Sequence, residues 1–160
     1  MARRIRIGDI IEIATKRGFA YAQYVLKKER WGALIRILPG VFHERPHNLC
    51  ELVAEKEKFV TFFPLQAAVN RNIFEVVANC DVPKHASEFP LFRDAVHIDR
   101  QGRVHNWVIW DGERSWPVDK LTREQASFPI RAVWNDTLLI ERIENGWTPE
   151  TDRRTLESMA

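Results

Sequence analysis

The N-terminal quarter of the chain contains three β-rich segments that follow one another with only brief turns between them. These segments are residues 9–15 (DIIEIAT), 19–26 (FAYAQYVL) and 33–38 (ALIRIL), and the last is stopped by Pro39 and Gly40. Alternating side chains and β-branched residues are typical of strands, and a short loop that contains glycine favours antiparallel pairing. We therefore expect residues 9–38 to form three consecutive antiparallel strands at the start of a strongly curved sheet.

Two short helices are expected after these strands. Asn48 precedes Glu51 by three residues, the spacing of a capping box, and Leu49 and Val53 then contribute to an apolar stripe. Pro64 suits the first position of a second short helix, because the proline nitrogen has no hydrogen to leave unpaired there.

Further strands are indicated by apolar and β-branched runs. These runs are residues 58–63, 73–78, 106–112 and 115–118, and the third runs into an Asp-Gly turn. Such a turn favours a hairpin, and Pro117 would place the returning strand at the edge of its sheet. The pattern weakens over residues 81–106, where Pro83, Pro90 and Gly102 interrupt it.

The C-terminal part of the chain carries two more helix signals. Thr122 and Gln125 have the spacing of a capping box. A longer helix begins near Asn135, continues through Leu139, and ends at Gly146. The charged residues after this helix are expected to be frayed.

These signals together predict one α+β domain that is mostly β. We expect a small, strongly curved antiparallel sheet or a partly open barrel with a few short peripheral helices. The expected domain spans residues 1–160, with an ordered core of about 5–148 and a charged C-terminal tail of about 149–160.

Charge and cysteine content limit the classes of partner and the location. A formal net charge of only +2 gives no reason to expect a nucleic-acid or membrane partner. Cys50 and Cys80 form no C-x-x-C motif, and two reduced, buried thiols are expected. The N-terminal basic residues have no apolar run behind them, so no signal peptide or membrane span is indicated, and the cytoplasm is the expected location.

His43 and His47 match the zinc motif H-E-x-x-H. On a helix this spacing places two imidazoles on one face for zinc, with Glu44 as general base. Pro46 disfavours a helix here, because the α conformation of Arg45 would clash with the proline ring. We therefore expect a loop, or a helix start, without bound metal at residues 43–47.

Other chemical signals are weaker. His97, Asp99 and His105 flank an expected turn and are a second, sparse candidate for metal ligands. Asp111 precedes a glycine at a hairpin turn, which already explains it. No nucleophile elbow, phosphate loop or dinucleotide motif is present, so we expect no enzyme activity, cofactor or metal. An active site assembled from distant residues stays open.

Tryptophan is the unusual component of the composition, with six in 160 residues. Core packing accounts for most tryptophans in small domains, but an exposed ring suits the centre of a protein interface. Partner binding is predicted to use at least one of Trp31, Trp107, Trp110 and Trp116. Trp107 and Trp110 are an odd number of positions apart, so one should face the core while the other is freer, with Trp116 joining it across the hairpin.

The N-terminal segments 8–13 (GDIIEI) and 18–24 (GFAYAQY) resemble the immunity protein 26 family of bacterial polymorphic toxin systems. The resemblance covers roughly the first forty residues and is vaguer afterwards. It implies a protein that binds and neutralises a cognate toxin encoded beside it, and it transfers no active site.

Three functions follow from the sequence. The first is a non-catalytic, soluble binding protein of the immunity type, whose partner is a cognate protein toxin. The alternative is a hydrolase with an assembled or histidine-based metal site. The third is a barrel-type nucleic-acid-binding module, which rests on fold analogy alone.

Overall fold

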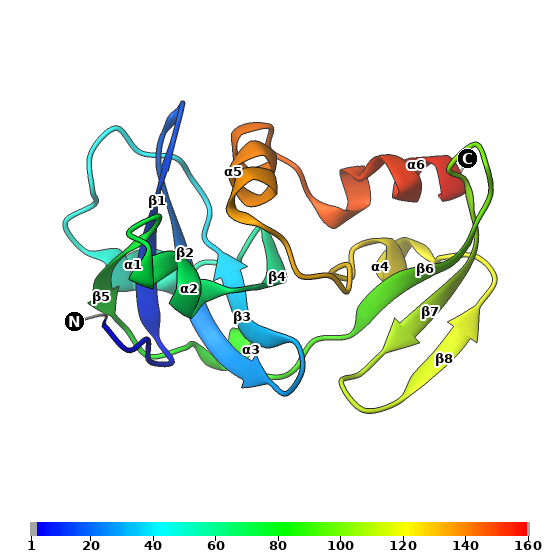
Figure 1. Cartoon of the computed structure of the whole chain (residues 1–160), viewed down its shortest axis with the longest axis horizontal. Coiled ribbons are helices and arrows are strands. Elements are labelled where there is room, and N and C mark those ends of the chain that lie inside the picture. Colours follow the sequence, from blue (N-terminus) through cyan, green and yellow to red (C-terminus); the bar gives the residue numbers. More distant parts are fainter. Residues whose placement is uncertain (1–2, 160) are drawn as a thin grey trace. The chain divides into compact units, whose positions relative to one another are not determined.

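The computed structural model describes residues 3–159, and Met159 is described for its backbone only. Within this range the chain forms eight strands in two antiparallel sheets, together with short helices (Figure 1). This confirms the predicted α+β class that is mostly β, and neither sheet closes into a barrel.

The described residues fall into two compact units, each of which is built from two stretches of the chain. The first consists of the described part of Met1–Glu88 together with Ala132–Gly146. The second consists of Phe89–Arg131 and the described part of Trp147–Ala160. That the whole chain behaves as one domain stays a prediction.

The first unit contains a five-stranded sheet in the order β4-β3-β2-β1-β5. Its strands are β1 (Asp9–Thr15), β2 (Gly18–Lys28), β3 (Gly32–Ile37), β4 (Phe59–Phe63) and β5 (Glu75–Asn79). The three consecutive antiparallel strands predicted for residues 9–38 are confirmed. Register shifts interrupt the pairing of β1 with β5 between Ile10 and Ile11, and the pairing of β2 with β3 between Tyr24 and Leu26. Such bulges bend and twist a sheet.

The turn between β1 and β2 fixes the loop that carries the two histidines of the H-E-x-x-H motif. Gly18 has φ of 130°, and a Cβ there would lie 2.5 Å from the carbonyl oxygen of Phe42, so only glycine fits. Phe19 and Phe42 exchange backbone hydrogen bonds of 2.7 and 2.9 Å. The loop is therefore attached to the start of β2.

Four helices belong to the first unit: α1 (Leu49–Val53), α2 (Leu65–Asn70), α3 (Lys84–Ser87) and α5 (Asp136–Glu144). Asn135 caps α5, since its side chain accepts a bond of 2.8 Å from the backbone nitrogen of Leu138. The expected capping box at Asn48 is wrong, because α1 begins there without a side-chain cap. The start of α1 is instead held through Leu49, which is buried in the core.

A disulfide joins Cys50 of α1 to Cys80, the residue after β5. The expectation of two reduced thiols is therefore wrong. The two cysteines are 30 residues apart, so no local motif indicates their bond. The fold of the chain brings them together. Cys80 lies in the core cluster with Ile10, Tyr21 and Leu38, which positions its sulfur against α1.

The second unit contains a three-stranded sheet in the order β6-β7-β8, formed by β6 (Phe92–Ile98), β7 (Val104–Trp110) and β8 (Ser115–Val118). The β7–β8 hairpin confirms the predicted Asp-Gly turn, and β8 with Pro117 is an edge strand as expected. β6 lies within residues 81–106, where the strand pattern of the sequence is weak. The capping box at Thr122 is confirmed at the start of α4 (Arg123–Ala126).

The C-terminal residues form η1 (Pro149–Thr151) and α6 (Arg153–Met159), so the expected frayed tail is wrong. Helix α6 lies over the sheet of its own unit (Figure 1). The guanidinium of Arg93 in β6 donates to the carbonyl oxygen of Pro149 and the hydroxyl of Thr155, both at 2.7 Å. These buried bonds tie the tail to the sheet.

No helix in residues 3–159 is both long enough and apolar enough to cross a membrane.

Candidate functional site

The outer edge of β5 is open. In the described part of the chain, β5 pairs with β1 along one edge, and no strand pairs with the other. The opposite end of the sheet is different, because Phe62 of β4 forms a bridge to Val133 and accepts a backbone bond from Trp134. An open edge presents backbone N–H and C=O groups to whatever chain approaches it.

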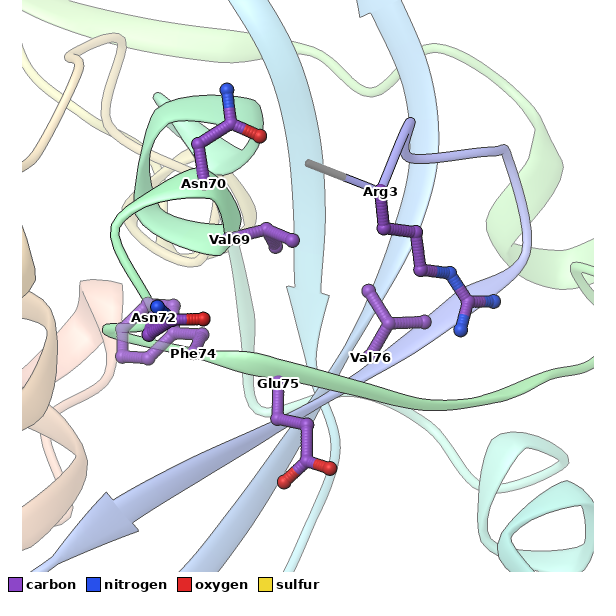
Figure 2. A pocket seen from close by; sticks show the side chains of 7 residues that line it. All are labelled: Arg3, Val69, Asn70, Asn72, Phe74, Glu75 and Val76. Carbon is purple, nitrogen blue, oxygen red and sulfur yellow. The ribbon is translucent and has the colours of Figure 1, made fainter. Parts of the chain in front are cut away.

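A hollow with a volume of about 640 Å³ adjoins this edge; we call it the β5 hollow. Its apolar lining consists of Val69 from α2 and of Phe74 and Val76. Its polar lining consists of Arg3, Asn70, Asn72 and Glu75. Figure 2 shows the side chains of Arg3 and Val76 on one side of β5 and that of Glu75 on the other.

The turn between α2 and β5 shapes one wall of the hollow. Asn72 adopts a left-handed conformation with φ of 58°, which asparagine tolerates better than most residues. The backbone nitrogen of Ile73 donates to Ala68 of α2, and the ring of Phe74 stacks on Phe63 at 5.3 Å. These contacts hold the chain as it leaves the helix and enters β5.

The N-terminal segment forms the other wall and brings Arg3 to the hollow. The side chain of Gln66 in α2 accepts a bond of 3.0 Å from the nitrogen of Ile5 and donates one of 2.7 Å to the carbonyl of Arg3. One glutamine thus fixes the backbone on both sides of Arg4. The hollow is therefore built from two stretches that lie far apart in the sequence, the N-terminal segment at Arg3 and residues 69–76.

The charges at the hollow are only loosely paired. A guanidinium nitrogen of Arg3 lies 4.0 Å from a carboxylate oxygen of Asp9, the outer limit of an ion pair, and the Arg3 side chain is 52% exposed. Asp9 also accepts bonds from the nitrogen of Arg6 and the side chain of Asn79. On the other side of β5, the Glu75 side chain is 72% exposed and lies 3.9 Å from Arg45.

Residues 43–47 are not helical, which confirms the prediction based on Pro46. Between the two histidines, Arg45 donates to Glu12 of β1 with bonds of 2.7 and 3.2 Å. The hydroxyl of Tyr21 donates to the same carboxylate at 2.9 Å. The hydrogen bond from Arg45 is the main reason that the pKa of Glu12 is lowered. Burial, followed by the bond to Glu12, raises the pKa of Tyr21 to about 12.

The other candidate ligands each have a local partner. His105 is 2.9 Å from Asp99, and this contact is the main reason that the pKa of the Asp99 carboxyl is lowered. His97 is 2.9 Å from the side chain of Asn106. Asp111 accepts bonds from the nitrogens of Glu113 and Arg114, which confirms its role in the hairpin turn. Within residues 3–159, no three or more His, Cys, Asp or Glu side chains are grouped to hold a metal.

Both tryptophans of β7 are buried, with Trp107 only 2% and Trp110 only 7% exposed. The prediction that one of them is freer is wrong, because both faces of β7 are covered. The guanidinium of Arg93 lies 4.8 Å from the centre of the Trp107 ring. Phe89 and Phe92 each lie 5.5 Å from the Trp110 ring.

Trp116 is the exposed ring among the four predicted residues, at 40%. It lies on the edge strand β8 opposite Ile109, which puts it on the Trp107 side of the sheet. Since Trp107 is buried, the two do not form the expected pair of exposed rings. Trp31 is half-buried and lies 5.5 Å from Phe62, ring centre to ring centre.

Comparisons of the chain with protein-family models, with curated proteins and with solved structures give no match. The resemblance to the immunity protein 26 family therefore rests on the N-terminal residues given for it, and it stays a prediction.

Proposed function

We propose that the chain is a non-catalytic binding protein that docks a partner protein, in the way an immunity protein binds and neutralises a cognate toxin. The observation that carries the proposal is the exposed ring of Trp116 on an edge strand. A large ring with few torsions to order is the type of residue that dominates interface energies.

The setting of Trp116 supports a docking role. The buried residues Trp107 and Ile109 lie on the same side of the sheet as the exposed ring and pack the neighbouring strand into the core. A ring on a rigid strand loses little conformational freedom when a partner covers it. Pro117 follows on β8 and has no N–H to donate, which discourages simple addition of another strand at this edge. The surface around Trp116 therefore suits side-chain packing.

The disulfide bears on where the protein acts. Disulfides form and persist in oxidising compartments and are rare in the cytosol. The bond between Cys50 and Cys80 thus opposes the cytoplasmic location that the sequence suggested. Trapping thiols with an alkylating reagent in intact cells separates the two: modified cysteines support the cytoplasm, and protected ones support an oxidising compartment.

The test of the proposal is neutralisation of the protein encoded beside this chain. Co-expression of the two should rescue growth, and the purified pair should form a complex. Trp116→Ala should weaken that complex by about 2 kcal/mol, or roughly 30-fold in Kd. The matched control is Val96→Ala, which truncates an exposed residue of the same sheet and should leave Kd unchanged.

Absence of both rescue and complex would overturn the proposal. The hydrolase alternative has its own readout, since one equivalent of zinc retained through dialysis would support it. If the Trp116→Ala variant binds the partner with the same Kd as the unmodified chain, the interface does not include β8.

A further inference from the structure

We propose that the open edge of β5 and the β5 hollow bind an extended peptide segment of another protein by strand addition, with an acidic side chain of that segment placed against Arg3. The site lies in the first unit and shares no residue with the Trp116 surface. The inference goes beyond the proposed function and stands whether or not a toxin is the partner.

The chemistry of the edge selects the class of ligand. Backbone N–H and C=O groups along a strand edge alternate at the spacing of another extended chain, so an added strand satisfies them in register. In residues 3–159 the outer edge of β5 has no such partner. The middle residues Val76, Val77 and Ala78 are half-buried, so an added chain would also cover apolar surface.

The shape of the site favours a single strand over a second copy of this chain. The hollow lies between the turn after α2, at Asn70 and Asn72, and the N-terminal segment at Arg3. One extended segment needs only the free edge of β5 and the hollow of about 640 Å³ beside it. A second copy would bring its own α2 turn and N-terminal segment into the same space.

The charges set the pattern of side chains in the ligand. Successive residues of a strand point to opposite sides. Arg3 and Val76 lie on one side of β5 and Glu75 on the other (Figure 2). A ligand residue on the Arg3 side should be acidic, because the guanidinium is exposed and only distantly paired with Asp9. Its neighbour faces Glu75, so a second acidic residue there should be disfavoured.

The contact is short. β5 has five residues, and Val77 has no register partner on β1 because a bulge lies there. Short strands and bulges limit edge-to-edge aggregation. The site is therefore selective for a brief extended segment, and it does not support open-ended growth of the sheet.

The first experiment selects ligands from a random heptapeptide display library on the immobilised chain. Enriched peptides should contain β-branched residues, lack a central proline, and carry aspartate or glutamate at one fixed position. The best peptide is then synthesised and titrated into the ¹⁵N-labelled chain. Its largest amide shifts should fall on Glu75–Asn79. N-methylation of the peptide at alternate residues, on the edge that faces β5, should raise Kd by about tenfold or more.

Matched variants test the charge. Arg3→Glu should raise Kd about tenfold. Arg4→Glu, which changes an adjacent exposed arginine that lines a different hollow, should change Kd less than about twofold. A peptide with lysine in place of its acidic residue should recover binding to the Arg3→Glu variant. Trp116→Ala should leave peptide binding unchanged, which separates this site from the proposed docking surface.

Several outcomes would overturn the inference. One is a library that gives no enrichment over the bare surface, and another is a set of amide shifts that avoids β5. Equal binding of the N-methylated peptide would exclude strand addition. Concentration-dependent shifts of the β5 amides without any peptide would identify a second copy of the chain as the occupant.

Discussion

Arg36 and Arg93 are both fully buried. Backbone carbonyl oxygens accept several of the hydrogen bonds that each guanidinium donates. Arg36 donates to the carbonyls of Val53 and Glu55 at 3.0 and 2.6 Å. Burial of a charge is costly unless hydrogen bonds satisfy it. In both cases these bonds connect a strand to a segment distant in sequence, so each arginine fixes a loop or tail. Sequence alone places arginine at the surface, and neither role was predicted.

The pair formed by Glu12 and Arg45 makes stability depend on pH in a definite direction. A carboxyl group whose pKa is lowered in the folded state stabilises the fold above its unfolded pKa. That stabilisation is lost as the pH falls through the lowered folded pKa. The pKa of Glu12 is lowered mainly by Arg45, so the contribution is present at neutral pH and absent in strong acid.

We therefore expect Arg45→Met to destabilise the chain at neutral pH, and the difference from the unmodified protein to shrink as the pH falls below the ordinary glutamate pKa of about 4.3. Urea unfolding at a series of pH values measures this difference in the free energy of unfolding. Arg30→Met is the control, because Arg30 is exposed and no shift of Glu12 is attributed to it. A difference that stays constant over the whole pH range would show that Arg45 acts by packing alone.

At the scale of elements, the disulfide connects helix α1 to the end of β5. The bond closes a loop of 30 residues and so restricts the unfolded chain; for that length the chain-entropy argument gives about 3.6 kcal/mol of stabilisation. Combining Cys50→Ser with Cys80→Ala should lower the free energy of unfolding by about this amount. Denaturant unfolding with and without dithiothreitol measures this loss in the free energy of unfolding.

The double variant is its own control, since dithiothreitol should destabilise the unmodified protein and leave the variant unaffected. Two free thiols in the mass spectrum of the purified, unreduced protein would contradict the bond.

The elements that were predicted correctly are those that local signals specify. The β7–β8 hairpin has an Asp-Gly turn, and α5 has a capping asparagine and a closing glycine. β6 was missed because its last residues are exposed on both faces and its register shifts twice against β7, so no alternation is visible. An element of this type is defined by its partner strand.

The candidate site was hidden for a similar reason. The strand β5 was predicted, but its place at an open edge follows from the order of the whole sheet. The hollow combines Arg3, Val69 and Val76, which are brought together only by the folded chain. The tryptophan hypothesis came from composition. Burial of Trp107 and Trp110 depends on Phe89, Phe92 and Arg93, which belong to the segment with the weak pattern.

At the scale of the whole molecule, the chain enters the second unit after Glu88, returns to the first at Ala132, and enters the second again at Trp147. The second unit is thus closed by its own C-terminal segment. Its stability depends on contacts between that segment and the sheet, and Arg93 makes several of them.

Arg93→Met should therefore destabilise the second unit. The guanidinium donates to the carbonyls of Ala126, Phe128 and Pro149 and to the hydroxyl of Thr155. Its removal takes this donor from the carbonyl oxygens of Ala126 and Phe128, while that of Pro149 keeps its bond from Thr155, and should cost about 3 kcal/mol or more. Amide hydrogen exchange locates the effect: protection should fall in β6, β7 and α6, while β1–β3 keep theirs, if the units open separately. An equal loss of protection throughout both sheets would show that the chain unfolds as one cooperative domain, as the sequence suggested.

Arg93→Lys distinguishes the charge of the side chain from its geometry. An ammonium cannot reach four acceptors in this arrangement, so this variant should restore only part of the protection.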